Sequence, residues 1–256
     1  MGDRIGQSSS DAGAALADAV AALGWPEIGR SVEGRPIFGR AFGGRAFGRA
    51  PDASGALGLP LLIFGGIHGD EPASVEAVLA LADRLARHAA GPPLFLIPLV
   101  NPDGIVRGSK NSACDVDLNR NFPARSFTTV HTPGYFPGVA PLSEPESRVV
   151  AEVVERGIRG AVAVHAPLAC VNYDGPAARW AETVAAACGW PARGDIGYPT
   201  PGSFGSWLGI DRGLPVLTLE LPPGPLAPVR QAASDALDAA ISHAPEALSA
   251  VQPHDK

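Results

Sequence analysis

The sequence predicts an α/β fold with a mainly parallel central sheet, and three observations support this prediction. Four continuous apolar runs, bounded by glycine, proline or polar residues, are typical of fully buried strands; they cover 59–66, 94–100, 160–166 and 214–221. Segments with helical periodicity alternate with these runs, as in layered α/β folds. A chain of 256 residues is also long enough to bury a single large core.

The N-terminal half is expected to form a helix, a hairpin, a loop and then a strand, a helix and a strand. These elements cover, in order, residues 11–23, 27–43, 44–58, 59–66, 72–89 and 94–100. Gly24 ends the first helix, and Glu33-Gly34 forms the hairpin turn. Pro72 opens the later helix, at a position where its missing N–H costs nothing.

The C-terminal half begins with an irregular segment, 101–142, and an ordered segment of this length is usually functional. Helices are expected over 144–157, 175–189 and 226–243, followed by a polar tail. Ser143 and Glu146 are expected to form a capping box for the first of these helices. We expect one catalytic domain over 1–256, with 1–25 and 244–256 peripheral to it.

Composition excludes several classes of partner. With 20 basic and 26 acidic residues the net charge is −6, which argues against nucleic acid or an anionic membrane as a partner. No apolar stretch reaches transmembrane length, and the N-terminus lacks the apolar core of a secretory signal. Three cysteines without a CxxC pair argue against a disulfide framework. We therefore expect a cytoplasmic protein, and the oligomeric state stays open.

Metal-competent residues follow three of the predicted strands. The first strand leads into His68 and Glu71, the strand at 160–166 contains His165, and the last strand contains Glu220. Ligands bind at the carboxyl ends of strands in open α/β sheets, so these residues are expected to meet in one crevice. Two histidines and a carboxylate form a catalytic zinc arrangement, and a second carboxylate is suited to deprotonate water there.

Structural explanations compete with this zinc hypothesis. A lone histidine in a strand is more often a hydrogen-bonded core residue, and no HExxH motif is present. Asp70 and Glu71 also suit the N-terminus of a helix, where the dipole favours acidic residues. Glu220 is harder to explain in this way, because a carboxylate with apolar neighbours on both sides is costly to bury.

A second group of polar residues lies in the segment NPDGIVRGSKNSACDVDLNRNFP, residues 101–123. Arg120 offers a planar fork suited to a carboxylate, and Asn119 adds a hydrogen-bond donor. The alternative is that Arg120 forms a structural ion pair with Asp115 or Asp117.

Taken together, these segments resemble the zinc carboxypeptidases of the carboxypeptidase A type. IGRSVEGRPI, GGIHGDEP, VNPDG, DLNRNFP and LTLEL occur in that family's order over about residues 28–221. YFPGVAPLSEPESR, HAPLACVNYDGPA and YPTPGSFGSW resemble the bacterial murein-peptide amidases within the family. The resemblance implies a zinc-carboxypeptidase-like fold, with a mixed, mostly parallel sheet flanked by helices, and one Zn²⁺ per chain.

The resemblance also implies roles for individual residues. The matching positions are the zinc ligands His68, Glu71 and His165, the general base Glu220, the carboxylate-binding pair Asn119 and Arg120, the mobile-loop Tyr198, and Gly205 at the floor of the specificity pocket. A glycine at this last position suggests room for a larger polar side chain.

Two positions depart from the family pattern. Lys110 stands where the family has a transition-state arginine, and a lysine stabilises an oxyanion by charge but without the bidentate fork. Asp115 stands where close relatives usually have glycine. Its negative charge is expected either to make the local potential more negative or to pair with Lys110.

The implied substrate is a small peptide with a free C-terminal carboxylate, the murein tripeptide L-alanyl-γ-D-glutamyl-meso-diaminopimelate, cut at the γ-D-glutamyl bond. Asp211 and Arg212 are hypothesised to bind the far ammonium and carboxylate of diaminopimelate, and a turn ion pair is the alternative. Three other functions stay open. They are an N-acyl amino acid deacylase of the aspartoacylase or succinylglutamate desuccinylase type, a catalytically weakened relative that binds muropeptides, and a serine hydrolase. The serine hydrolase would use Ser203 or Ser206, but neither serine lies in a GxSxG elbow.

Overall fold

The computed structural model describes residues 3–43, 61–87 and 93–249, and its centre is a seven-stranded mixed sheet with the order β3-β5-β4-β6-β9-β7-β8. The strands are β3 (Arg40–Phe42), β4 (Leu61–Phe64), β5 (Leu94–Ile97), β6 (Gly160–His165), β7 (Cys170–Asp174), β8 (Ala192–Arg193) and β9 (Val216–Glu220). The pairs β3·β5 and β7·β9 are antiparallel, and the other four are parallel. The predicted mixed, mostly parallel sheet is confirmed.

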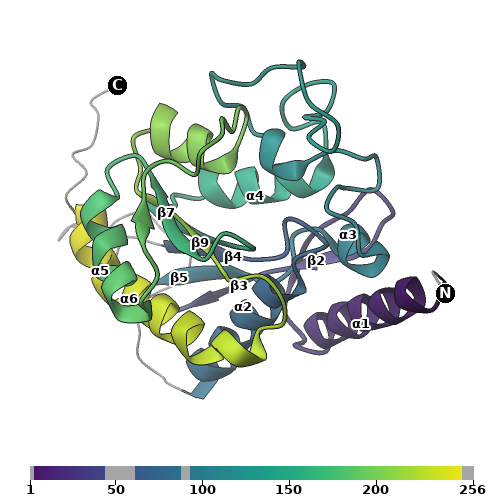
Figure 1. Cartoon of the computed structure of the whole chain (residues 1–256), viewed down its shortest axis with the longest axis horizontal. Coiled ribbons are helices and arrows are strands. Elements are labelled where there is room, and N and C mark those ends of the chain that lie inside the picture. Colours follow the sequence, from purple (N-terminus) through teal and green to yellow (C-terminus); the bar gives the residue numbers. More distant parts are fainter. Residues whose placement is uncertain (1–2, 44–60, 88–92, 250–256) are drawn as a thin grey trace.

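Helices cover both faces of this sheet (Figure 1). The helices α2 (Pro72–Arg87), α5 (Ala178–Cys188) and α6 (Arg230–Ser249) pack on one face. On the other face lie α4 (Pro145–Glu155) and a π-helical segment, Gly205–Asp211. The remaining helices are α1 (Asp3–Ala21) and α3 (Pro102–Arg107), and β1 (Glu27–Arg30) and β2 (Pro36–Phe38) form a separate antiparallel pair.

Burial on both faces explains why the strands are continuously apolar. Successive side chains of a strand point to opposite faces. In β4, Leu61 and Ile63 join the hydrophobic cluster beneath α2 and α6, whereas Leu62 and Phe64 join the cluster beneath α4. Neither face of β4 meets water, so this strand needs no polar alternation.

Several local expectations need correction. The segment 101–142 contains a helix, α3, because the Asn101 side chain accepts a hydrogen bond from Gly104 N at 2.8 Å and Pro102 is a suitable first residue. The capping box is wrong: Glu144 is the N-cap of α4 and makes no side-chain cap bond, while Glu146 accepts a hydrogen bond from Val32 N.

Two strands were also absent from the sequence prediction, β7 and the short β8 at the sheet edge. The loop expected over 44–58 lies outside the described residues. Among the helices that the structure describes, none has the length and apolar character needed to cross a membrane.

Candidate active site

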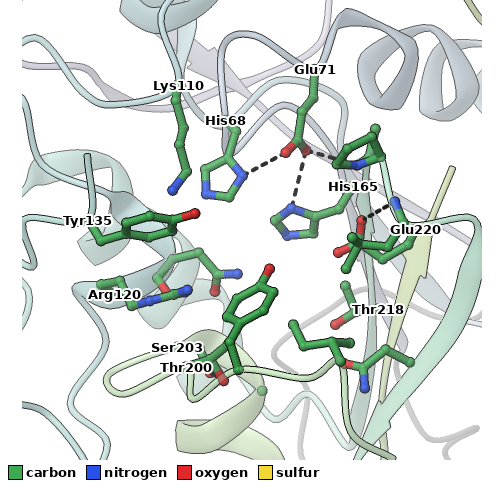
Figure 2. A pocket seen from close by; sticks show the side chains of 18 of the residues that line it. His68, Glu71, Lys110, Arg120, Tyr135, His165, Thr200, Ser203, Thr218 and Glu220 are labelled. Carbon is green, nitrogen blue, oxygen red and sulfur yellow. Dashed lines mark hydrogen bonds and ion pairs between the residues drawn. The ribbon is translucent and has the colours of Figure 1, made fainter. Parts of the chain in front are cut away.

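The carboxyl ends of neighbouring parallel strands bring the predicted catalytic residues together. His165 is the last residue of β6 and lies in register with Glu220, the last residue of β9. His68 follows β4, the neighbour of β6 on its other side. Figure 2 shows Glu71 between His68 and His165, with Glu220 to one side of them. The four residues line one pocket.

A glycine allows the loop that contains His68 to pack closely against α3. A Cβ at Gly69 would lie 2.0 Å from the carbonyl carbon of Gly104, so a side chain at this position would force the two segments apart. The Gly69 amide also donates a hydrogen bond to Lys110 O at 3.2 Å. The loop is therefore fixed at the position from which His68 and Glu71 enter the pocket.

His68, Glu71 and His165 present a set of donor atoms that lie within 4.8 Å of one another. His68 Nδ1 is 2.8 Å from Glu71 Oε1, and His165 Nδ1 is 3.2 Å from Glu71 Oε2. The backbone amide of Ala166 also donates to Glu71 Oε2, at 3.1 Å. Two imidazoles and a carboxylate beside a pocket form a donor set that fits a catalytic zinc ion with an open position.

The charges of this group stabilise one another. Burial favours neutral forms, but the carboxylates of Glu71 and Asp117 outweigh it and raise the pKa of His68 to about 9. Burial likewise opposes ionisation of Glu71, but His68 and His165 outweigh it and lower the Glu71 pKa to about 2. Glu71 is therefore ionised at neutral pH, as a metal ligand must be.

Asp117 connects the donor set to Lys110. Its buried carboxylate lies 3.1 Å from His68 Nε2 through Oδ1 and accepts a hydrogen bond from Lys110 Nζ at 2.6 Å through Oδ2. Burial opposes its ionisation, but His68, Arg120 and Lys110 together hold its pKa well below the usual range. A carboxylate on the second ring nitrogen fixes the imidazole so that Nδ1 faces Glu71.

Glu220 has the properties of a general base. The side chain is buried, and burial raises the pKa of its carboxyl group, an effect that His165 opposes and Glu71 reinforces. The amide of Leu168 donates to Glu220 Oε2 at 3.4 Å. A carboxylate with a raised pKa accepts a proton more readily than one in water.

The opposite wall of the pocket is cationic, with Lys110, Arg120 and Tyr135 across from Glu220 in Figure 2. Asn119 Oδ1 accepts a hydrogen bond from Phe204 N at 3.0 Å, so the NH₂ group of Asn119 is turned to serve as a donor. Arg120 is 6% exposed and donates from one guanidinium nitrogen to Asn119 O at 2.7 Å.

Lys110 is held from two sides. Its Nζ lies 3.7 Å from the ring centroid of Tyr135 and bonds Asp117 on the other side. Asp115 does not pair with Lys110: its side chain accepts a hydrogen bond from Asn111 at 2.9 Å. Asp115 also has φ of 60°, a left-handed conformation that glycine adopts without strain.

Comparison with known families identifies this arrangement. The zinc carboxypeptidase family model matches residues 23–179, more than half of the chain. The chain belongs to the zinc carboxypeptidase family. The resemblance noted from the sequence motifs is confirmed, and the enzyme is a zinc peptide hydrolase.

Individual relatives of this zinc carboxypeptidase include bacterial amidases. It is 38% identical over 192 residues to murein peptide amidase A of Escherichia coli K12, covering 68% of this chain and 74% of that protein. The murein peptide amidase A of Vibrio campbellii is 33% identical over 202 residues, covering 72% and 78% of the two chains. The crystal structure of murein-tripeptide amidase MpaA from Escherichia coli O157 superimposes with a TM-score of 0.67 at 30% identity, over 90% of this chain and 93% of that one.

The pocket of this zinc carboxypeptidase brings together most of the residues predicted from the sequence. They are His68, Glu71, Lys110, Asn119, Arg120, His165, Tyr198, Gly205 and Glu220. Tyr198 is 45% exposed, as expected of a residue in a loop at the pocket rim.

Asp211 and Arg212 are not among the residues that line this pocket in the described structure. Asp211 accepts a hydrogen bond from Arg125 N at 2.6 Å, and Arg212 forms an exposed ion pair with Glu155 at 2.5 Å. Their hypothesised binding of diaminopimelate stays a prediction. The described structure shows no ion pair between the two residues, because Arg212 pairs with Glu155.

Three polar residues of the pocket region had no assigned function in the sequence interpretation. Asp117 lies in the alternating DVDL run, two residues before Asn119. This spacing is the one feature of the sequence that indicated a place for Asp117 near the site. Tyr135 lies in the irregular segment and Asp174 in a strand that was not predicted. Their positions depend on contacts between distant parts of the chain.

Proposed function

We propose that this zinc carboxypeptidase is an amidase that hydrolyses the bond between γ-D-glutamate and meso-diaminopimelate in murein tripeptide. The observation that supports the proposal best is the convergence of His68, Glu71, His165 and Glu220 in one pocket with Arg120, in a chain 38% identical to a murein peptide amidase A. We propose His68, Glu71 and His165 as the ligands of one zinc ion.

The zinc ion, when bound, polarises the scissile carbonyl and makes hydroxide available at neutral pH. Glu220 takes the proton of the attacking water as the oxygen adds to the carbonyl carbon. When the C–N bond breaks, Glu220 delivers that proton to the amino group of diaminopimelate. The buried position of Glu220 suits both steps, because a raised pKa lies closer to the working pH.

The cationic wall orients the substrate. The guanidinium of Arg120 and the NH₂ group of Asn119 bind the free α-carboxylate of the last residue, which confines cleavage to the terminal bond. Tyr198 closes over the substrate from the rim. Lys110 stabilises the negative charge that develops on the carbonyl oxygen.

We also propose that the enzyme acts in the cytoplasm, on peptides recovered from the cell wall. The three cysteines, Cys114, Cys170 and Cys188, are free thiols, and Cys114 is exposed, as suits a reducing compartment.

Turnover of L-Ala-γ-D-Glu-meso-diaminopimelate by the purified, zinc-loaded protein tests the proposal. We expect release of diaminopimelate that stops with a chelator and falls about 10²–10⁴-fold in Glu220→Gln, with zinc still bound at one per chain. Glu182→Gln, an exposed change on α5, serves as the matched control. Cleavage of N-acetylaspartate or N-succinylglutamate in its place would favour the deacylase. Absence of any turnover with zinc bound would favour the weakened binding relative.

A further inference from the structure

The N-terminal helix α1 packs against α3, and Figure 1 shows the two helices side by side. Val20 of α1 lies in one hydrophobic cluster with Ile105 of α3 and with Leu99, which follows β5. The family model begins its match at residue 23, so α1 lies outside the matched part of the chain. The comparison with the family therefore assigns no role to this helix.

Gly13 lets α1 approach the backbone of α3. A Cβ at this position would lie 1.9 Å from Ile105 O and 3.3 Å from Val106 Cα. Both are backbone atoms of α3, which cannot rotate away as the end of a long side chain can. Glycine is a poor residue for the interior of a helix, because it loses more conformational freedom on folding than other residues do. Its presence in α1 is explained by the contact with α3, which leaves no room for a side chain.

The short helix α3 depends on its neighbours for its position. A helix of six residues is too short to be stable by itself, so packing must hold it. Gly13 meets α3 at Ile105. One residue earlier, Gly104 is met by Gly69, in the loop that contains His68. Successive residues of α3 thus contact α1 and the loop of the proposed zinc ligands.

The N-cap residue of α3, Asn101, connects this helix to two parts of the catalytic pocket. Its side chain has no exposed surface. Its NH₂ group donates to the carbonyl oxygens of Ile67 at 3.4 Å, Lys110 at 3.4 Å and Asn111 at 3.2 Å. Ile67 directly precedes His68 in the chain. A displacement of α3 would therefore disturb both a proposed zinc ligand and the lysine proposed to stabilise the oxyanion.

We propose that α1 holds the catalytic centre in place through α3, with Gly13 as a positioning residue for His68 and Lys110. When α1 is seated on α3, the loop of His68 has one position; when it is not, the imidazole takes several orientations and zinc binds less tightly. This inference rests on the zinc ligands of the proposed function. It gives a part in zinc binding to a helix within 1–25, the segment that the sequence analysis treated as peripheral.

The zinc dissociation constant, measured by competition with a coloured chelator, tests the proposal without requiring turnover. Alanine forms helices better than glycine, so helix propensity alone predicts that Gly13→Ala improves α1. We expect the opposite effect on the site, a zinc affinity about 2–30-fold weaker than that of the wild-type protein, because the added methyl group separates α1 from α3. Ala15→Gly is the matched control: it weakens the same helix at an exposed position and should bind zinc as the wild-type protein does.

A second pair of variants separates positioning from overall stability. Val20→Ala removes packing from the cluster that contains Ile105 without creating a clash, and we expect it to weaken zinc binding in the same direction as Gly13→Ala. Leu248→Ala also removes a buried side chain, but from α6, in the cluster on the other side of the core. Urea unfolding should show that both variants are less stable, whereas only Val20→Ala should lose zinc affinity.

Wild-type zinc affinity in Gly13→Ala and Val20→Ala would overturn the proposal, and Val20→Ala alone decides if Gly13→Ala does not fold. An equal loss of affinity in Leu248→Ala would overturn it too, because overall stability would then explain the effect. If the tripeptide is not hydrolysed but zinc affinity depends on α1, the proposed substrate fails and this inference holds. Hydrolysis of the tripeptide without such a dependence would reverse that conclusion, and a wild-type protein that binds no zinc would overturn both.

Discussion

Replacing Asp117 by asparagine tests how the zinc site is supported. The aspartate has no exposed side-chain surface, and three donors converge on it: His68 Nε2 at 3.1 Å, Lys110 Nζ at 2.6 Å and Asn119 N at 2.9 Å. Asparagine keeps the shape of the side chain but has one acceptor oxygen and no charge. At least one of these three donors then loses its partner.

The expected magnitude follows from the position of Asp117 behind His68. Loss of a carboxylate that orients a metal-binding imidazole typically weakens metal affinity 10–100-fold, which is about 1.4–2.7 kcal/mol. The direction agrees with the electrostatics, because Asp117 is one of the two carboxylates that raise the pKa of His68. Without it, the imidazole is a weaker electron-pair donor to the metal.

Competition with a chromophoric chelator at neutral pH measures the zinc dissociation constant of each variant. Asp115→Asn is the control, since this exposed residue lies two positions away and its side chain contacts Asn111, not His68. We expect Asp115→Asn to bind zinc as the wild-type protein does. Wild-type zinc affinity in Asp117→Asn would refute the reasoning.

Two further variants test other contacts. Tyr135→Leu removes the aromatic ring beside Lys110, and we expect kcat/KM on the tripeptide to fall about 2–30-fold. Tyr135→Phe keeps the ring and should keep wild-type activity. Equal losses in the two variants would contradict a role for the ring. Burial raises the pKa of Glu146 from 4.5 to about 7. The stability that the protonated carboxyl group contributes is therefore fully present below pH 4.5 and is lost as the pH rises through 7. Glu146→Gln cannot ionise, so its unfolding free energy relative to wild type should increase by about 3 kcal/mol from pH 4.5 to pH 8, and parallel pH curves would refute this.

Strands buried on both faces were predictable from the sequence, and β7 was not. β4 and β6 are continuously apolar because helices cover both sides of the sheet. In β7 the residues Asn172 and Asp174 face the pocket, and their polarity interrupts the apolar pattern. In β7, therefore, the signal that identifies a buried strand is missing.

The predicted catalytic residues lie at strand ends, a position that the sequence reveals, whereas the residues that surround them in the pocket do not. His165 and Glu220 end adjacent parallel strands, and the topology of such a sheet brings their ends together. Tyr135 meets Lys110 across 25 positions of mostly irregular chain, with no repeat or spacing to indicate the contact. Asp174 reaches the pocket floor through the close packing of Gly205, which appears only in three dimensions.

The surroundings of Lys110 bear on whether the enzyme is active despite lacking the family's arginine. A lysine has three donors on a flexible stem, and immobilising that stem costs conformational entropy. Here Asp117 accepts one hydrogen bond at 2.6 Å, Gly134 O accepts another at 3.5 Å, and the Tyr135 ring packs against the ammonium. The position of the charge is thus fixed before substrate binds, and one donor is left for the oxyanion contact that we propose for Lys110. This preorganisation favours a working amidase over a relative that only binds muropeptides.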